Sequence, residues 1–167
     1  MSTVQPRAQP VDLAKSAKRL MMPVEQISMV QKQLTIQTHG RSTTEITERV
    51  RAIVTDSAVQ TGICHLFLHH TSASLMLCEN ADPSVRGDLE RFFSRLVKDG
   101  DPIFEHTSEG IDDMAAHIRS VLTLSSLSVP ITDGHCALGT WQGIYLWEHR
   151  HHAHRRKVTI TVMGTTA

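Results

Sequence analysis

The chain has 167 residues and carries 17 Lys and Arg against 17 Asp and Glu, so its formal net charge is zero. That length suits one domain with a real core, and 40% hydrophobic residues indicate a globular fold rather than disorder. A balanced charge gives no long-range field to attract nucleic acid or an anionic membrane, so neither is expected as a partner. The unusual feature is the count of 11 histidines, because imidazole is the commonest metal ligand.

The cysteines and the hydropathy both indicate a cytoplasmic protein. Cys64, Cys78 and Cys136 are odd in number and widely spaced, which argues against a disulfide framework or a cysteine-based zinc site. No apolar run approaches the roughly 20 residues of a membrane span, and the N-terminus lacks the charged-then-apolar pattern of a signal peptide. We therefore expect reduced thiols and no membrane partner.

The pattern divides the chain into an extension at residues 1–27 and a folded domain at 28–167. Pro6 and Pro10 favour irregular chain, so the extension is predicted to be flexible, with a short helix over 12–21 as the alternative. Alternating apolar residues from 28 to 37 predict a half-buried strand. Ser42 and Glu45 then form a capping-box pattern for a helix that ends before Gly62.

The middle of the chain predicts two strands and two helices. Residues 63–70 are apolar on both faces, as in a central strand, and the strand at 74–78 follows so closely that a hairpin is expected. Asp82 with Pro83 begins one helix, and Asp112 begins the next. The expected apolar stripes are Val85, Leu89, Phe92, Phe93 and Leu96 in the first helix and Met114, Ile118, Val121 and Leu122 in the second.

The last third of the chain is strand-like. Strands are expected around residues 127–131, 144–147 and 158–162, with a turn at Asp133-Gly134 and a polar connection at 148–156. The order of elements lacks regular β-α-β alternation. It therefore predicts a single α+β domain with a mainly antiparallel sheet and about three helices.

Polar side chains gather where the two central strands end. His70 follows an apolar strand face to its end, beside the hydroxyls of Thr71 and Ser72, which either bind an anion or satisfy a turn. Asn80 and Asp82 follow the second strand, although helix capping alone explains Asp82. A hairpin would hold His70 and Asn80 at opposite ends. A single pocket therefore requires a different strand pairing, strand curvature or a second subunit.

A second group lies on a loop and the helix after it. His106 and His117 are eleven residues apart, and Asp113 stands four residues before His117, on the same helix face. Two neutral imidazoles and a carboxylate are a reasonable metal-binding set. The alternative is a loop whose polar groups satisfy its own backbone.

The third region begins at Trp141, which lies between two glycines and suits a wall against a flat ligand or a subunit contact. Residues 148–157 contain four histidines and four Arg or Lys residues. Because no aromatic residues are interleaved to stack on bases, a solvated turn is favoured there over a metal or nucleic-acid patch.

Taken together, seven runs resemble the YjbQ-like family, the so-called secondary thiamine-phosphate synthases, in the family's order over about residues 28–165. The runs are HTSAS at 70–74, ENADP at 79–83, HTSEG at 106–110, DDMAAHI at 112–118, TDG at 132–134, LGTWQGIYL at 138–146 and EHR at 148–150. The resemblance implies an α+β homotrimer with a polar pocket near subunit boundaries. It also implies an activity that joins hydroxymethylpyrimidine diphosphate to a thiazole phosphate and releases diphosphate.

The leading hypothesis is therefore a transferase that acts on a small phosphorylated substrate with a divalent ion, zinc or magnesium. The expected metal ligands are His70, His106 and His117, and the expected catalytic residues are His70, Asn80, Asp113 and His117. The expected substrate-binding residues are Thr71, Ser72, Asp82, Trp141, Gln142 and Arg150. The alternative is a trimeric protein that binds a metal or a small ligand without catalysis, and nucleic-acid binding through residues 150–157 ranks third.

Overall fold

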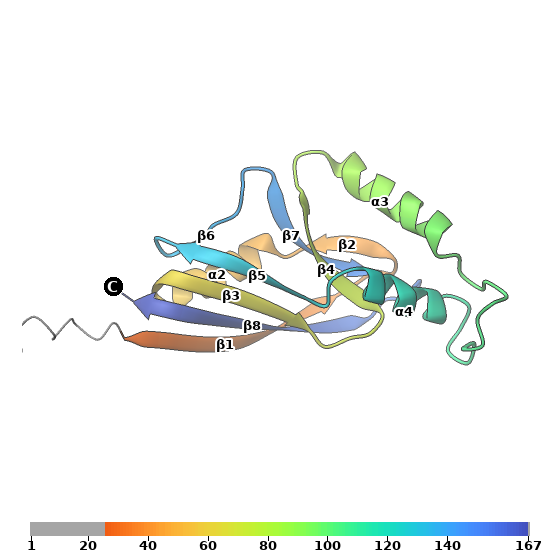
Figure 1. Cartoon of the computed structure of the whole chain (residues 1–167), viewed down its shortest axis with the longest axis horizontal. Coiled ribbons are helices and arrows are strands. Elements are labelled where there is room, and N and C mark those ends of the chain that lie inside the picture. The colour runs from red at the N-terminus through yellow and green to blue at the C-terminus, as the bar shows by residue number, and fades with distance from the viewer. Residues whose placement is uncertain (1–25, 167) are drawn as a thin grey trace, which may run out of the picture.

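The computed structural model describes residues 26–166, whose strands form two antiparallel sheets (Figure 1). The first sheet has the strand order β1-β8-β3-β5-β6 and the second has the order β2-β7-β4. The strands are β1 (Ile27–Gln37), β2 (Ser42–Glu45), β3 (Val59–Leu68), β4 (Ala73–Glu79), β5 (Ser126–Thr132), β6 (His135–Cys136), β7 (Gln142–Glu148) and β8 (Arg155–Thr166). The helices are α2 (Thr47–Asp56), α3 (Pro83–Leu96) and α4 (Asp113–Leu122).

These elements confirm the predicted α+β class with mainly antiparallel strands. The flexible extension predicted at residues 1–27, and the alternative helix over 12–21, lie almost wholly outside the described residues. None of the helices within residues 26–166 is long and apolar enough to cross a membrane.

One apolar core lies between the two sheets and α2. Every second side chain of a strand faces it, because side chains alternate across a sheet. The five-stranded sheet contributes side chains such as Leu66, Val129 and Ile160; the three-stranded sheet contributes Leu75, Ile144 and Leu146; and α2 contributes Val50, Ile53 and Val54.

β3 is central in its sheet but is buried on only one face. Leu66 and Leu68 are at most 2% exposed, whereas Ile63 and Phe67 on the opposite face are 48% and 45% exposed. The predicted burial of both faces is therefore wrong. The outer face of β3 is exposed because the second sheet covers only the inner face of the first.

The predicted hairpin between the strands on either side of His70 is also wrong. β3 pairs with β8 and β5, whereas β4 pairs with β7 in the other sheet. The short connection between them passes from one sheet to the other and buries Leu68 and Ala73 at its two ends in the shared core. Of the alternatives raised by the sequence, a different pairing of the strands is the one the structure confirms.

The capping-box prediction at Ser42 is wrong, because these residues form β2. They pair with β7, and Thr43 lies opposite Trp147. The helix begins at Thr47, whose hydroxyl donates to the Glu45 carboxylate at 2.8 Å and accepts from the backbone N–H of Ile144 at 2.9 Å. Pairing with a distant strand outweighs a weak local helix preference.

None of the residues in the predicted apolar stripes of the other two helices is fully buried; they are half-buried or exposed. Among the described residues, nothing on α3 is buried, and Phe92 and Leu96 are 53% and 57% exposed. The residues that α4 buries are Asp113, Ala115, Ala116 and Arg119. α4 therefore turns small and charged side chains inward, because it covers a polar site rather than the apolar core.

The connection predicted as a solvated turn is buried where it leaves β7 and exposed at its tip. His151 and His152 are exposed, but Glu148, His149 and Arg150 are buried. The Glu148 carboxylate accepts hydrogen bonds from the guanidinium of Arg156, which is also buried, and a buried charge is tolerated when it is paired. Burial alone would raise the pKa of Glu148, but the Arg156 guanidinium and the Arg150 backbone N–H outweigh it and hold the pKa below its ordinary value.

Candidate metal centre

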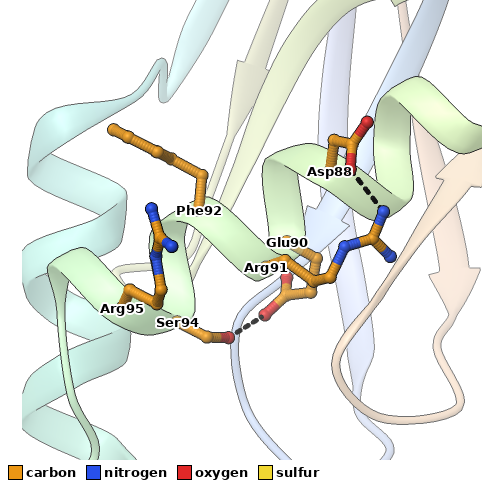
Figure 2. A pocket seen from close by; sticks show the side chains of 6 residues that line it. All are labelled: Asp88, Glu90, Arg91, Phe92, Ser94 and Arg95. Carbon is orange, nitrogen blue, oxygen red and sulfur yellow. Dashed lines mark hydrogen bonds and ion pairs between the residues drawn. The ribbon is translucent and has the colours of Figure 1, made fainter.

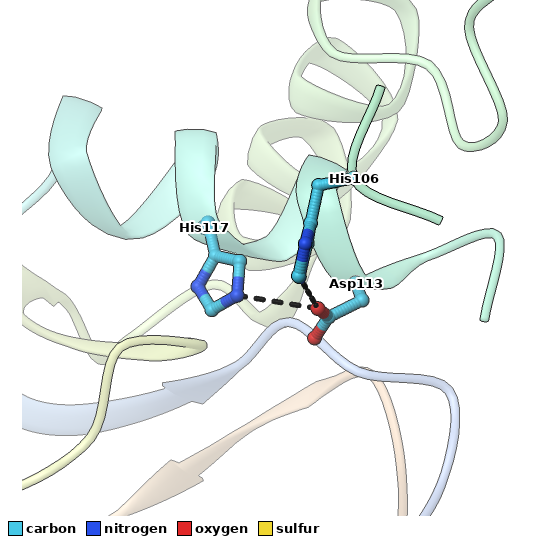
Figure 3. Close-up of side chains that lie close together, drawn as sticks. All are labelled: His106, Asp113 and His117. Atoms are coloured by element: carbon cyan, nitrogen blue, oxygen red, sulfur yellow. Dashed lines mark hydrogen bonds and ion pairs between the residues drawn. The ribbon is translucent and has the colours of Figure 1, made fainter. Parts of the chain in front are cut away.

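Three side chains converge at the N-terminus of α4. His106 comes from the preceding loop, while Asp113 and His117 lie one turn apart on the helix, and both imidazole rings face the carboxylate (Figure 3). Oδ2 of Asp113 lies 2.8 Å from Nε2 of His106 and 3.2 Å from Nε2 of His117. Their ligand atoms all lie within 4.8 Å of one another. Atoms bound to one tetrahedral zinc ion at about 2.0–2.2 Å lie roughly 3.4 Å apart, so this set is close to ligating geometry.

The tautomer of His117 makes this cluster more than a chance contact. Its Nδ1 lies 2.9 Å from the carbonyl oxygen of Thr71, which can only accept, so Nδ1 carries a proton. In a neutral ring, Nε2 then presents a lone pair to an oxygen of Asp113. Two lone pairs at that distance repel each other, so a proton or a metal ion is needed between them. A metal-binding histidine is usually oriented in this way, by a carbonyl oxygen that accepts from the ring nitrogen not bound to the metal.

Arg150 holds the carboxylate of Asp113 from the other side. The Arg150 guanidinium donates to Oδ1 of Asp113, to Oδ2 of Asp112 at 3.1 Å and to the carbonyl oxygen of Glu109 at 2.7 Å. The side chain was predicted to bind substrate, but it is buried, and its donors are engaged within the protein. We conclude that it positions Asp113 with Oδ2 turned toward the histidines.

Asp112 contributes to the fold of this region by pairing with Arg150. Burial would raise the pKa of its carboxyl, but the His151 backbone N–H and the Arg150 guanidinium outweigh burial and lower the pKa. The carboxylate therefore stays charged and balances Arg150. The sequence pattern assigned Asp112 only to helix capping, and its side chain makes no capping hydrogen bond.

His70 lies outside the cluster, although its neighbour in the chain contacts His117. Nε2 of His70 accepts a hydrogen bond from the backbone N–H of Lys157 at 2.8 Å. Burial, followed by the nearby Arg156 guanidinium, lowers the pKa of His70 below its usual value. In this structure His70 therefore serves as a hydrogen-bond acceptor for the backbone of β8.

The two hydroxyl residues after His70 also have positions of their own. Thr71 is exposed and serves the cluster through its carbonyl oxygen. Ser72 is buried, and both its hydroxyl and its carbonyl oxygen accept from Arg156. The hydroxyl of Ser72 is thus already engaged by the Arg156 side chain.

The remaining predicted site residues lie at the far end of β4. The Ala73 carbonyl, at the start of β4, accepts from Ser120 of α4, which places this end beside the histidines. Asn80 follows the other end and bonds through its backbone to Trp141, which is 63% exposed. The six steps between the seven residues of β4, at about 3.4 Å each, separate its two ends by roughly 20 Å. Trp141 and Asn80 therefore do not share a pocket with His106 and His117 within one protomer.

Gln142 and Asp82 also lie at this far end of β4. Gln142 uses its side-chain oxygen to accept from the backbone N–H of Gly139 at 2.8 Å. Asp82 accepts from the backbone N–H of Ser84 at 2.8 Å as the N-cap of α3, and this hydrogen bond lowers its pKa. The capping alternative for Asp82 is the one the structure shows.

A cavity of about 500 Å³ lies along α3, and its lining includes none of His106, Asp113 and His117 (Figure 2). It is lined only by side chains of that helix, and the polar ones include the pairs Asp88 with Arg91 and Glu90 with Ser94. Nothing in this lining resembles the donor set at α4. It is better described as the open side of an uncovered helix.

The fold and the donor set together define an α+β sandwich with a two-histidine, one-carboxylate centre. Residues 32–165 match the family described as UPF0047 protein YjbQ-like, and the chain belongs to that family.

Individual relatives agree with this assignment. The chain is 49% identical to the UPF0047 protein sll1880 of Synechocystis, over 78% of this chain and 89% of that protein. It is 45% identical to the UPF0047 protein YjbQ of Escherichia coli O157:H7, over 80% of this chain and 97% of that protein. A solved structure of a yjbq/upf0047 family protein from Clostridium acetobutylicum is 32% identical, covers 80% of this chain and 98% of its own, and has a TM-score of 0.70.

Proposed function

We propose that the protein binds a divalent metal ion through His106, Asp113 and His117 and uses it to act on a small phosphorylated substrate. The observation that carries the proposal is the oxygen of Asp113 between two imidazole nitrogens, with the His117 tautomer fixed by Thr71. The side chain of His106 is 45% exposed and that of His117 is 31% exposed, so both rings lie near the protein surface.

The donor set favours zinc over magnesium. Imidazole nitrogens suit zinc and other late first-row ions, whereas magnesium prefers oxygen ligands and keeps several of its waters. Three protein ligands leave a fourth position for water or substrate, as in catalytic rather than structural zinc sites. His70, which the sequence grouped with these ligands, is not needed for the set.

The reaction that fits such a centre is the transfer expected from the family resemblance. Joining hydroxymethylpyrimidine diphosphate to a thiazole phosphate places growing negative charge on the departing diphosphate. A bound metal ion supplies positive charge at those oxygens. Because the Arg150 guanidinium is engaged by Asp112 and Asp113, this site depends on an added cation to offset that charge.

Association into a homotrimer is the second part of the proposal. The exposed apolar side chains of α3 support association between copies, because an amphipathic helix normally buries its apolar stripe. Contact between Asn80 and Trp141 of one copy and the histidine cluster of another would complete the single pocket that one protomer lacks. The number of three subunits comes from the family resemblance.

The experiment that tests the proposal measures diphosphate release from these two substrates. Protein stripped with a chelator should lose turnover and regain it with zinc, whereas Asp113→Asn should stay inactive after zinc is added. His65→Ala is the matched control, because His65 lies on the outer face of β3 and bonds only to Ser128 among the described residues. Full turnover by the stripped protein and by Asp113→Asn would refute a metal-dependent reaction.

The same measurement distinguishes the alternative function. A trimeric metal-binding protein without catalysis would retain one zinc ion per chain, be stabilised by it, and release no diphosphate under any condition. Stoichiometric zinc together with absent turnover would therefore select that alternative.

A further inference from the structure

A cavity of about 220 Å³ adjoins the candidate metal centre on the side of the loop that carries His106. His106 belongs to both, since the residue lines the cavity and its imidazole faces Asp113. Besides two glycines, the lining consists of Asp101, Pro102, Phe104, His106, Thr107 and Ile111.

The loop that builds this cavity is closed on itself. The backbone N–H of Gly100 donates to the carbonyl of Ile111 at 2.8 Å, which ties the two ends of the loop together. Within it, the backbone N–H of Phe104 donates to the carbonyl of Asp101 at 3.0 Å. Gly110 has a φ of +110°, a conformation that side-chain-bearing residues rarely adopt. These constraints preform the cavity before any ligand arrives.

The size of the cavity suits a ligand portion of one ring. A cavity of roughly 150 Å³ is enough to hold benzene, whereas sites for drug-sized ligands begin near 300 Å³. At about 220 Å³ there is room for a six-membered ring with small substituents but not for a fused two-ring base with its sugar. The apolar atoms of Phe104, Pro102 and Ile111 suit the faces of such a ring.

The charges in the lining select the type of substituent. Asp101 is the one acidic residue of the lining, and no Lys or Arg belongs to it. One carboxylate oxygen accepts from the backbone N–H of Ile103 at 3.1 Å, and the other makes no hydrogen bond within the described part of the chain. A phosphate would be repelled here, while an amino or amidino group would be attracted.

We propose that this cavity binds the ring of the substrate, a single planar ring with an amine-type donor that bonds to Asp101. The phosphorylated end of the same molecule then extends past His106 toward the metal. The link between the two ends rests on the proposed function, but the cavity and its preference do not require a bound ion.

The test uses benzamidine and benzoate as probes, because they share one ring and carry opposite charges. Each is titrated into the ¹⁵N-labelled full chain without metal, and backbone amide shifts are followed. Benzamidine should produce saturable shifts at Gly100, Gly110 and Ile111, with binding at least about tenfold tighter than that of benzoate. Equal binding of both probes, or shifts spread over the surface, would overturn the proposal.

Two variants connect the shifts to this cavity. Thr107→Trp should fill it and weaken benzamidine binding at least about tenfold, whereas the neighbouring Ser108→Trp, outside the lining, should leave it unchanged. Asp101→Asn has the same shape and no charge, so it should remove the preference for benzamidine even if the larger Trp disturbs the loop. Unchanged preference in Asp101→Asn would contradict the assigned role of its carboxylate.

A further variant keeps the outcome separate from that of the metal. Asp113→Asn should lose zinc binding while it still binds benzamidine normally. Absent zinc binding in the unmodified protein together with normal benzamidine binding would refute the proposed function and leave the ring site standing. Normal zinc binding together with absent benzamidine binding would refute the ring site alone.

Discussion

Asp113 is the residue on which the candidate metal centre depends, because one of its oxygens contacts Arg150 and the other contacts the histidines. One oxygen accepts from Arg150, and the other lies between the two histidines. This division fixes the carboxylate plane, so the rotamer needed for metal binding is set before an ion arrives. Preorganisation of this kind is the usual contribution of groups that contact a ligand residue rather than the metal.

Arg150→Lys tests that contribution. Lysine keeps the positive charge but cannot reach Asp112, Asp113 and the Glu109 carbonyl with one planar group. We expect zinc affinity to fall by about 10- to 100-fold in calorimetric titration. Arg155→Lys, at an exposed position of β8, is the matched control and should bind zinc normally. A folded Arg150→Lys protein with unchanged affinity would show that Asp113 needs no positioning.

His149 gives a prediction about pH. It is fully buried, Nε2 pairs with Ser74 at 2.9 Å, and Nδ1 has no partner within residues 26–166. Burial, followed by the charge of Arg119, lowers the pKa of His149 to about 3. Between about pH 6.5 and 3 the unfolded chain binds a proton there that the folded chain does not, so stability is lost as the pH falls through that window.

The predicted loss from this residue is about 3 kcal/mol between pH 7 and pH 4, measured by urea unfolding. His149→Gln keeps a donor toward Ser74 but does not titrate. The variant should be less stable at pH 7, and its stability should change less with pH by about that amount. Parallel pH profiles for the two proteins would show that His149 titrates normally in the fold.

At the scale of elements, the exposed stripe of α3 is the feature with the clearest consequence. Phe92→Glu with Leu96→Glu should leave the secondary structure intact, since neither side chain is buried in the protomer. Light scattering after size-exclusion chromatography should then show a smaller assembly than for the unmodified protein. The same charges added to the exposed side of α2, as Ala52→Glu with Thr55→Glu, should not change the mass. An unchanged mass for the α3 variant would exclude this stripe as a contact between copies.

Local signals in the sequence predicted some elements well. Asp82 and Pro83 begin α3 as expected, and Asp133 and Gly134 have the positive φ values of a tight turn between β5 and β6. Where the prediction failed, the deciding contact was distant in the chain. Ser42–Glu45 forms a strand because it pairs with β7. β4 also pairs with β7, and not with β3 as the expected hairpin required. Local patterns carry no information about such pairing.

The site was predictable to a similar extent. The spacing of Asp113 and His117 on one helix face was readable, and the loop position of His106 made convergence reasonable. The roles of Arg150 and His149 could not be predicted, because a charged segment is expected to be solvated unless its buried partners are known. Asp112, Glu148 and Arg156 supply those partners from other parts of the chain.

At the scale of the whole molecule, the charged network around the candidate metal centre lies at one end of the sandwich. The core between the sheets is apolar, whereas α4, the loop before it and the end of β7 carry the charged network. The crossing between β3 and β4 brings the Thr71 carbonyl to this end, and that carbonyl fixes the tautomer of His117. The fold therefore serves the centre by holding three distant backbone segments in register around one carboxylate.

The most direct test of this account is X-ray absorption at the zinc K edge of the protein loaded with one zinc ion per chain. We predict nitrogen or oxygen neighbours at about 2.0–2.1 Å and the outer-shell scattering of two imidazole rings, which should fall to the solvent-like signal in a His106→Ala, His117→Ala variant. A spectrum with no imidazole scattering, or with sulfur neighbours near 2.3 Å, would contradict the assigned centre.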